Sequence, residues 1–367
     1  MIQLKDLCQK ASSNIAQKDL EGHEGQYPIY GASGLIGYVD FYKQENPYVA
    51  VVKDGAGIGR VMCLPEKSSV IGTMQYILPN EGVNVHYLAF AMEHMNLAKY
   101  FSGATIPHIY FKDYGKEKLL ERTEKEQKSI AEILSKMDSL ISLRKQQLAK
   151  LDELVKARFV EMFGNPIENT MNWPKKLLRD ITTKIGSGAT PKGGRESYPN
   201  AGVSLIRSMN VYDGQFLYKD LAHLTDEQAT QLNGVTVEAE DVLVNITGAS
   251  VARSCVVPKD VLPARVNQHV AIVRCNRELL NPIFTNKMFI NNEFKKALLS
   301  IGESGGATRQ AITKKQLEEL SVVVPPLSIQ NEFFTFSERV DQQKQTVQQS
   351  LDKLELMKKA LMQEYFG

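Results

Sequence analysis

The glycine-rich segment at residues 51–59 is the first place where residue types and spacing could do chemistry. A predicted strand runs there into Gly-Ala-Gly, an arrangement that in nucleotide-binding proteins cradles phosphates with backbone amides at the start of a helix. A related segment at residues 248–253 lacks two of the glycines, and no obvious helix follows either segment. We therefore interpret both as a strand, a turn and a second strand, with an arginine (Arg60 or Arg253) after the turn.

Other catalytic motifs are weak. Asn46-Pro47-Tyr48 resembles the Asn-Pro-Pro-Tyr motif with which amino-methyltransferases grip a flipped base, but the second proline is missing and no S-adenosylmethionine loop accompanies it. No Walker loop, no set of carboxylates and no Ser, His and Asp set stands out. His108 and His269 are more typical of surface or core histidines than of ligands. The sequence therefore argues against catalysis by this chain.

The four cysteines are scattered and form no Cys-x-x-Cys pair. Because neither they nor the six histidines cluster at ligand spacing, a structural zinc site is not expected. The cysteines are typical of reduced, mostly buried thiols in a cytosolic protein. No apolar run is long enough to span a membrane, and residues 1–10 lack the features of a signal peptide. We expect a cytoplasmic protein with no cofactor, metal or membrane partner of its own. The cysteines are Cys8, Cys63, Cys255 and Cys275.

The elements that must position these residues are duplicated. Residues 103–164 align without a gap with residues 306–367, with 16 identities in 62 positions. Upstream, the Gly-Ala-x-x-x-Arg sequence that ends at Arg60 matches the one that ends at Arg253. Between its Leu-Lys/Arg-Asp start and Gly-Ala-Thr, the second copy is longer by 29 residues. The chain is thus two copies of one unit, each with a variable front part and a helical tail.

Each tail is predicted to be one long amphipathic helix. Residues 123–163 contain no Pro or Gly, and apolar residues recur seven apart from Leu134 to Met162. The second tail begins after Pro325-Pro326 and has the same spacing. Neither helix can bury its stripe alone, so we expect an antiparallel coiled-coil pair; the alternative is that each helix docks on its own domain. Three further residues are expected to widen the first stripe: Ile133, Leu140 and Leu154.

The front parts are predicted to be mixed and strand-rich. β-Branched and aromatic runs between glycine-rich turns indicate short strands at residues 48–52, 70–71, 76–78, 203–206, 242–244 and 270–273. One helix is expected near residues 85–101, with a counterpart near residues 282–299. The predicted fold class is α+β, with an internal pseudo-twofold repeat. Its parts are a first domain (1–116), a first long helix (117–165), a second domain (166–325) and a second long helix (326–367).

Bulk charge does not point to nucleic acid. The chain carries a net charge of +2, with −1 in residues 1–116 and +3 in residues 166–325. Any positive surface must therefore come from placement. Polar loops of small residues with Thr, Arg or Gln are more suggestive, because such loops suit phosphates and base edges; an ordinary solvated loop is the alternative reading. These loops lie at residues 102–105, 188–195 and 304–310.

This order of elements resembles the specificity subunits of Type I restriction-modification systems. The resemblance lies in two variable domains, each followed by a long helix that ends in Phe-Gly, and it covers essentially the whole chain. The resemblance also includes several short sequence segments that are typical of the family, and their order and duplication are its most specific features. The family-like phrases are residues 27–34, 148–163, 241–249 and 316–326.

The resemblance implies a DNA-binding protein without catalysis of its own. Each domain would read half of a split double-stranded target, and the paired helices would act as a ruler and as the dock for two modification subunits. S-Adenosylmethionine and adenine methylation would belong to those partners, and ATP and Mg²⁺ to the restriction subunits. A coiled-coil adaptor that binds only protein and a methyltransferase are the alternatives.

Recognition domains vary widely in this family, so individual DNA contacts do not transfer. We chose candidates by loop position and residue type. The candidate DNA-binding residues are Lys53, Arg60, Thr105, His108, Lys112, Lys192, Arg195, Arg207, Asn210, Arg253, Thr308, Arg309 and Gln310.

Overall fold

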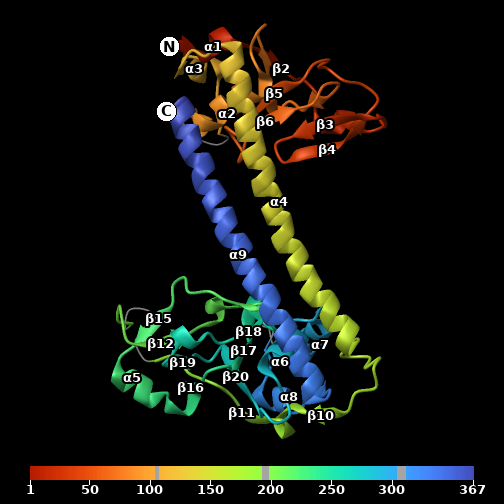
Figure 1. Cartoon of the computed structure of the whole chain (residues 1–367), viewed down its shortest axis with the longest axis vertical. Coiled ribbons are helices and arrows are strands. Elements are labelled where there is room, and N and C mark those ends of the chain that lie inside the picture. The colour runs from red at the N-terminus through yellow and green to blue at the C-terminus, as the bar shows by residue number, and fades with distance from the viewer. Residues whose placement is uncertain (104–106, 192–197, 304–310) are drawn as a thin grey trace. The chain divides into compact units, whose positions relative to one another are not determined.

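The computed structural model describes residues 1–103, 107–191, 198–303 and 311–367. The chain divides into two compact units. Unit 1 contains residues 1–147 and 347–367, and unit 2 contains residues 148–346. Each unit holds one strand-rich domain and one segment from each of two long helices, α4 (Glu124–Phe163) and α9 (Leu327–Phe366) (Figure 1).

The domain of unit 1 is built on an antiparallel sheet with the strand order β2-β8-β5-β6. Strand β5 is completely buried, because its two faces pack into different cores. Val49 and Val51 face the core that contains helix α2 (Val85–His94), whereas Tyr48 and Val52 face a second core. The strands are β2 (Cys8–Ser12), β5 (Tyr48–Val52), β6 (Val61–Leu64) and β8 (Met74–Pro79).

A smaller sheet with the order β4-β3-β7 completes this domain. β3 and β7 pair in parallel, and β3 and β4 form a hairpin. These strands are β3 (Tyr27–Gly31), β4 (Gly34–Val39) and β7 (Ser69–Val70).

The domain of unit 2 repeats this plan. Its antiparallel sheet has the order β11-β20-β17-β18, which places equivalent strands in the same positions as in unit 1. Its second sheet has the order β15-β12-β19-β16 and again contains one parallel pair, β12 with β19. The strands are β11 (Thr182–Ser187), β12 (Val203–Ile206), β15 (Ala222–Leu224), β16 (Thr236–Val237), β17 (Val242–Asn245), β18 (Ser254–Val256), β19 (Ala264–Val266) and β20 (Val270–Cys275).

The internal repeat predicted from the sequence is confirmed down to single hydrogen bonds. The amide of Ile109 donates to the carbonyl of Lys53 at 3.0 Å, and the equivalent amide of Ile312 donates to the carbonyl of Ile246 at 2.8 Å. Within the described residues, several elements of the second domain have no counterpart in the first. Among them are the hairpin of β13 (Val211–Tyr212) and β14 (Gln215–Phe216), helix α5 (Asp226–Gln231) and strand β16.

All six predicted strands are present, but each predicted domain helix is interrupted. In unit 1, Asn96 adopts the left-handed conformation with φ +50° and separates α2 from a 3₁₀ turn, η2 (Leu97–Tyr100). In unit 2, Asn291 accepts from the amide of Glu293 at 3.0 Å and starts a second helix. The two helices there are α6 (Pro282–Phe289) and α7 (Asn292–Glu303).

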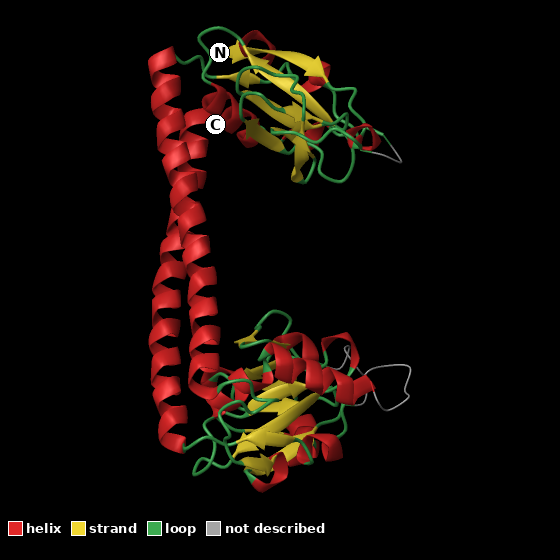
Figure 2. Cartoon of the chain, turned by 90° about the vertical axis from the view of Figure 1, so that its right-hand side faces the viewer, coloured by secondary structure: helices red, strands yellow, loops and turns green. Residues whose placement is uncertain are grey.

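The long helices pair antiparallel within each unit (Figure 2). In unit 1, Lys145 near the middle of α4 reaches Glu355 of α9 at 2.9 Å, and Lys358 reaches Asp138 at 2.7 Å. In unit 2, the late α4 residue Arg158 reaches the early α9 residue Glu332 at 3.1 Å. Early residues of one helix thus meet late residues of the other, as predicted.

The buried stripe of α4 is narrower than predicted. Leu134 and Ile141 are buried on the seam. The three residues expected to widen the stripe are instead exposed, because each precedes a seam residue and lies about 100° around the helix from it. Their exposed fractions are 39% for Ile133, 43% for Leu140 and 46% for Leu154.

Helix α4 begins at Glu124, later than the predicted residue 117. The preceding residues form strand β9 (Lys118–Leu119), which pairs with β1 (Ile2–Gln3). Thr123 then starts the helix in a capping box with Glu126, whose amide donates to the Thr123 hydroxyl at 3.3 Å.

A buried glutamine locks each long helix to its domain. Gln127 of α4 accepts at 3.0 Å from the amide of Asn84, the residue that caps α2. Its equivalent on α9, Gln330, accepts at 2.9 Å from the amide of Asn281, the residue that caps α6. Since both glutamines are nearly or fully buried, these bonds fix how each helix starts. No helix in the described part of the chain is long and apolar enough to cross a membrane.

Candidate nucleic-acid interface

The turn after strand β5 in the first domain, and the turn after β17 in the second, each lie beside the segment that follows the repeated Gly-Ala-Thr sequence. An isolated bridge joins Asp54 to His108 in the first domain, and another joins Thr247 to Ala311 in the second. The turn joins β5 to β6, and in the second domain β17 to β18, which confirms the predicted strand, turn and strand. The repeat thus brings several predicted site residues to one place in each domain.

In the first domain this place is organised around a carboxylate, Asp54. The ammonium of Lys53 lies 3.5 Å from it, and the ring nitrogen Nδ1 of His108 is bonded to it. The His108 ring packs on Tyr110 with 4.2 Å between centroids, and Lys112 lies 5.2 Å from the same tyrosine ring. Three predicted site residues therefore meet here, and two of them contact an acid that offsets positive charge.

Arg60 follows the same turn and is tied to the fold. Its guanidinium donates to the carbonyl of Ala32 at 2.6 Å, which links the turn to the β3–β4 hairpin. Gly59 before it has φ +79°, and a Cβ there would lie 2.4 Å from the backbone nitrogen of Ala98. The first turn therefore requires a glycine at this position.

In the second domain the same place forms a recess of about 600 Å³. Arg253 lies across the ring of Tyr212, with 4.2 Å between the guanidinium carbon and the ring centroid. The Thr247 hydroxyl is 2.5 Å from Nδ1 of His269. The described residues that line the recess are Ser208, Met209, Tyr212, Thr247, Gly248, Ala249, Ser250, Arg253, His269 and Ala311.

Asn210 supports one wall of this recess and does not face the solvent. It is fully buried, its amide donates to the carbonyl of Leu217 at 2.8 Å, and its Oδ1 accepts from the amide of Arg207 at 3.1 Å. The predicted DNA contact of Asn210 is therefore corrected to a structural role. The Arg207 guanidinium donates to the carbonyl of Asp220 and lies 5.9 Å from the ring of Tyr198.

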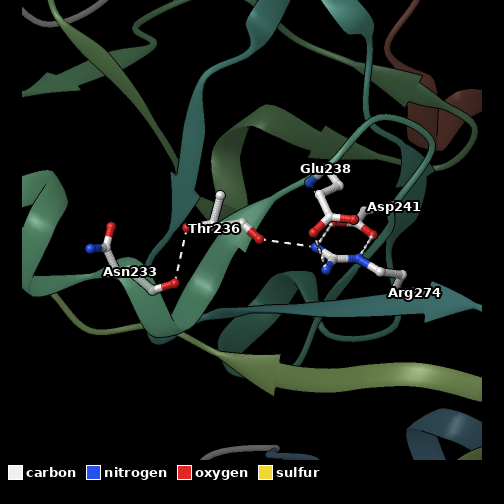
Figure 3. A network of polar contacts seen from close by, with 5 residues as sticks. All are labelled: Asn233, Thr236, Glu238, Asp241 and Arg274. Atoms are coloured by element: carbon white, nitrogen blue, oxygen red, sulfur yellow. Dashed lines mark hydrogen bonds and ion pairs between the residues drawn. The ribbon is translucent and has the colours of Figure 1, made fainter.

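An ion pair stabilises the sheet that carries the recess (Figure 3). Arg274 of β20 binds both oxygens of Asp241, at 2.8 and 2.9 Å, and also reaches Glu238 and the carbonyl of Thr236. Asp241 is buried, and its carboxylate raises the pKa of the Arg274 guanidinium. We call these interactions of Arg274 with Asp241, Glu238 and Thr236 the Arg274 clamp. They attach β16 and the start of β17 to β20 and so help to position the turn at the other end of β17.

A family model for the Type I restriction modification DNA specificity domain matches residues 1–153 and 171–356. The chain belongs to this family. The two matches correspond to the two copies of the repeat, each with most of a long helix.

Known relatives agree with this assignment. The chain is 23% identical over 408 aligned residues to the type I restriction enzyme MjaX specificity subunit of Methanocaldococcus jannaschii, covering 98% of this chain and 91% of that protein. The crystal structure of the Type I S subunit from M. genitalium is 15% identical, with a TM-score of 0.65 and coverage of 100% and 95%. A chain from a structural study of complex assembly in the type I R-M system is 13% identical, with a TM-score of 0.55 and coverage of 99% and 96%. The two structures establish the shared fold.

Six of the candidate residues of this specificity protein lie outside the described residues, and their assignment stays a prediction. They are Thr105, Lys192, Arg195, Thr308, Arg309 and Gln310.

The sequence analysis did not identify three residues that form the turn region of the first domain or the recess of the second domain. Asp54 and Thr247 each stand directly before the matched Gly-Ala pair, so the alignment of the two copies could have found them. Tyr212 belongs to the hairpin that the first copy lacks, and nothing in the sequence linked it to Arg253.

The cysteines are free thiols, as predicted, and three of the four are buried. Burial raises the pKa of Cys8 and Cys255 to about 12, so these thiols stay protonated at neutral pH. The described part of the chain contains no group of three His, Cys, Asp or Glu residues that could hold a metal ion.

Proposed function

We propose that this chain reads a bipartite DNA target and directs the modification and restriction subunits of a Type I system to it, without catalysing a reaction itself. Membership of the specificity family supports DNA target recognition. The observation that supports a bipartite DNA target is the duplication of the domain. Two domains with the same strand order would each supply a separate DNA-reading surface.

The paired helices suit the docking of partner subunits. Several large apolar side chains of α4 face outward from the pair, and burying them on a partner helix would be favourable. In this assignment, S-adenosylmethionine binds the modification subunits, and ATP and Mg²⁺ bind the restriction subunits. The exposed apolar residues of α4 include Leu140, Leu143, Leu154 and Val160.

The test is to map methylated adenines in DNA from a methylation-free host that carries this chain with its modification subunit. We expect one bipartite motif with methylated adenines in it, and none in hosts that carry either protein alone. Methyl transfer by the isolated chain would contradict the proposal, and so would methylation without sequence preference by the complex.

A further inference from the structure

The Arg253 side chain is held in place by an aromatic ring and not by hydrogen bonds to the described residues. Its side chain is supported by the Tyr212 ring, 4.2 Å away. Among the described residues, its guanidinium makes no hydrogen bond and no ion pair. A guanidinium that is stacked on an aromatic ring keeps its donors in a fixed plane, so little rotational freedom is lost when it binds an anion.

The surroundings of Arg253 favour an anion. The described residues that line the recess include no Asp or Glu. Three of them, Ser208, Thr247 and Ser250, carry a hydroxyl group, which is neutral and able to donate a hydrogen bond to an anionic oxygen. The nearest carboxylate in sequence to Tyr212 is Asp213, and Lys295 pairs with it. No carboxylate among the described lining residues therefore offsets the positive charge of Arg253.

The first domain lacks this arrangement at the equivalent turn. Arg60 donates to the Ala32 carbonyl instead of remaining unbonded. Asp54 stands where the second domain has the neutral Thr247, and a carboxylate would repel a bound anion. The two domains also differ in net charge, with −1 in residues 1–116 and +3 in residues 166–325.

We propose that the recess in the second domain binds a phosphate group of the DNA backbone, with Arg253 as its cation. This inference rests on the proposed DNA-binding function. A duplex presents phosphates as its outermost groups, which fit a concave surface, whereas base edges lie on the groove floor and are reached by protruding elements. Arg253 lies inside a recess, supported by Tyr212, so it suits a phosphate and not a base.

The consequence is an asymmetry between two copies of one fold. The Arg253 recess adds one phosphate contact, so the second domain contributes a salt-dependent share of affinity that the equivalent turn of the first does not. This contact carries no sequence information, so its removal weakens binding to every duplex alike.

The experiment measures binding of the full chain, assembled with its modification subunit, to two fluorescent duplexes. One contains the mapped target and the other is non-specific, and both are titrated at several salt concentrations. Arg253→Ala is expected to weaken binding to both duplexes about tenfold. It should also lower the slope of log affinity against log salt by about 1, with an unchanged methylation motif. Arg253→Lys is expected to restore the slope, since a lysine keeps the charge.

A second variant transfers the feature of the first domain. Thr247→Asp places a carboxylate beside Arg253 and is expected to weaken binding to both duplexes at least as much as Arg253→Ala does. Thr247→Ser keeps the hydroxyl and adds no charge, so as the matched control it is expected to lose much less affinity than Thr247→Asp. Thermal unfolding of each variant shows whether a loss of binding comes from a loss of folding.

Three outcomes would overturn the phosphate site while leaving the proposed function intact. They are a changed base in one half of the methylation motif of Arg253→Ala, an unchanged salt slope, and a Thr247→Asp variant that binds like the wild type. Failure of the wild-type complex to prefer its target over the non-specific duplex would instead reject the proposed function.

Discussion

Each domain contains a four-stranded antiparallel sheet with the same strand order, but the two sheets are stabilised by different side-chain interactions. In unit 2 the buried Asp241 pairs with Arg274 across β17 and β20. The ladder register places Tyr48 and Leu78 at the equivalent positions of unit 1. There the Tyr48 hydroxyl bonds to Ser68 at 3.0 Å, and its ring packs on Tyr76. An ion pair in one copy is thus replaced by an aromatic cluster in the other.

This difference shows which features the fold depends on. Strand order, the alternation of buried apolar residues and the glutamine locks at Gln127 and Gln330 are the same in both copies. Other polar residues differ, such as Asp241 in the interior and Asp54 and Thr247 at the turns. A backbone fixed by register and helix docking can therefore accept different side chains at the turns, which suits the proposed reading of one half-site by each domain.

The largest expected effect tests whether the two domains act separately. Exchanging residues 178–308 for the equivalent segment of another specificity subunit should replace one half of the target completely and leave the other half unchanged. The reason is that each domain has apolar cores of its own. The measurement is the methylation motif of the assembled complex. The matched control exchanges residues 1–105 and should change only the other half; a change in both halves from either exchange contradicts separate action.

The next prediction asks whether the helices set the spacing between the half-sites. Inserting four residues near Gln146, with a matched insertion near Gln349, lengthens each helix by about 6 Å. Because the duplex rises about 3.4 Å per base pair, the preferred spacer should grow by one to two base pairs, with both half-sites kept. The methylation motif again gives the result. An active variant with the original spacer would show that the helices do not set the distance.

The ion pair of unit 2 should matter more than a surface pair beside it. Arg274→Met leaves Asp241 buried without a cation and, among the described residues, with only the Glu238 amide as a donor, at 2.7 Å. It should cost about 3 kcal/mol of unfolding free energy, at the low end of the range for broken buried pairs because Arg274 is partly exposed. Arg277→Met removes an exposed pair with Glu240 and should cost less than about 1 kcal/mol. Urea unfolding compares them, and equal losses would reject the assigned role of the clamp.

The smallest effects are expected at Gly59 in the β5–β6 turn and Ala252 in the β17–β18 turn. Each is the last residue of its turn with a left-handed backbone conformation. Gly59→Ala should cost about 1–3 kcal/mol, because the new Cβ would meet the backbone of Ala98. Ala252→Gly should change stability by less than about 1 kcal/mol, because relief of the strained backbone is offset by the flexibility of glycine. Thermal unfolding measures both, and a Gly59→Ala protein as stable as the wild type would show that the turn can move.

The repeat, the strands and the antiparallel helices could be predicted because each leaves a regular pattern in the sequence. Seven-residue spacing identified the seam of α4 through Leu134 and Ile141. The same pattern could not give the width of the stripe, because exposed residues such as Leu140 are apolar too. Local composition also could not show the interruption at Asn96, where a single left-handed residue ends the helix.

The candidate site was predicted less well than the fold. Residue type pointed to Arg60, Asn210 and Arg253 alike, yet the structure ties the first to Ala32, buries the second and leaves the third on Tyr212. Which polar side chain is already bonded depends on neighbours far apart in the sequence. Only the packed structure separates these cases.

Unit 1 is discontinuous in sequence, and this has a consequence for synthesis on the ribosome. Its core includes Met362 and Phe366 of α9, and the Phe366 ring packs 5.3 Å from Tyr87 of α2. Residues 347–367 emerge only after all of unit 2 has been translated, which takes on the order of tens of seconds at typical elongation rates. During that interval the apolar cluster that contains Tyr87 and Leu134 lacks its α9 residues, so the first domain to be made is the last to be completed.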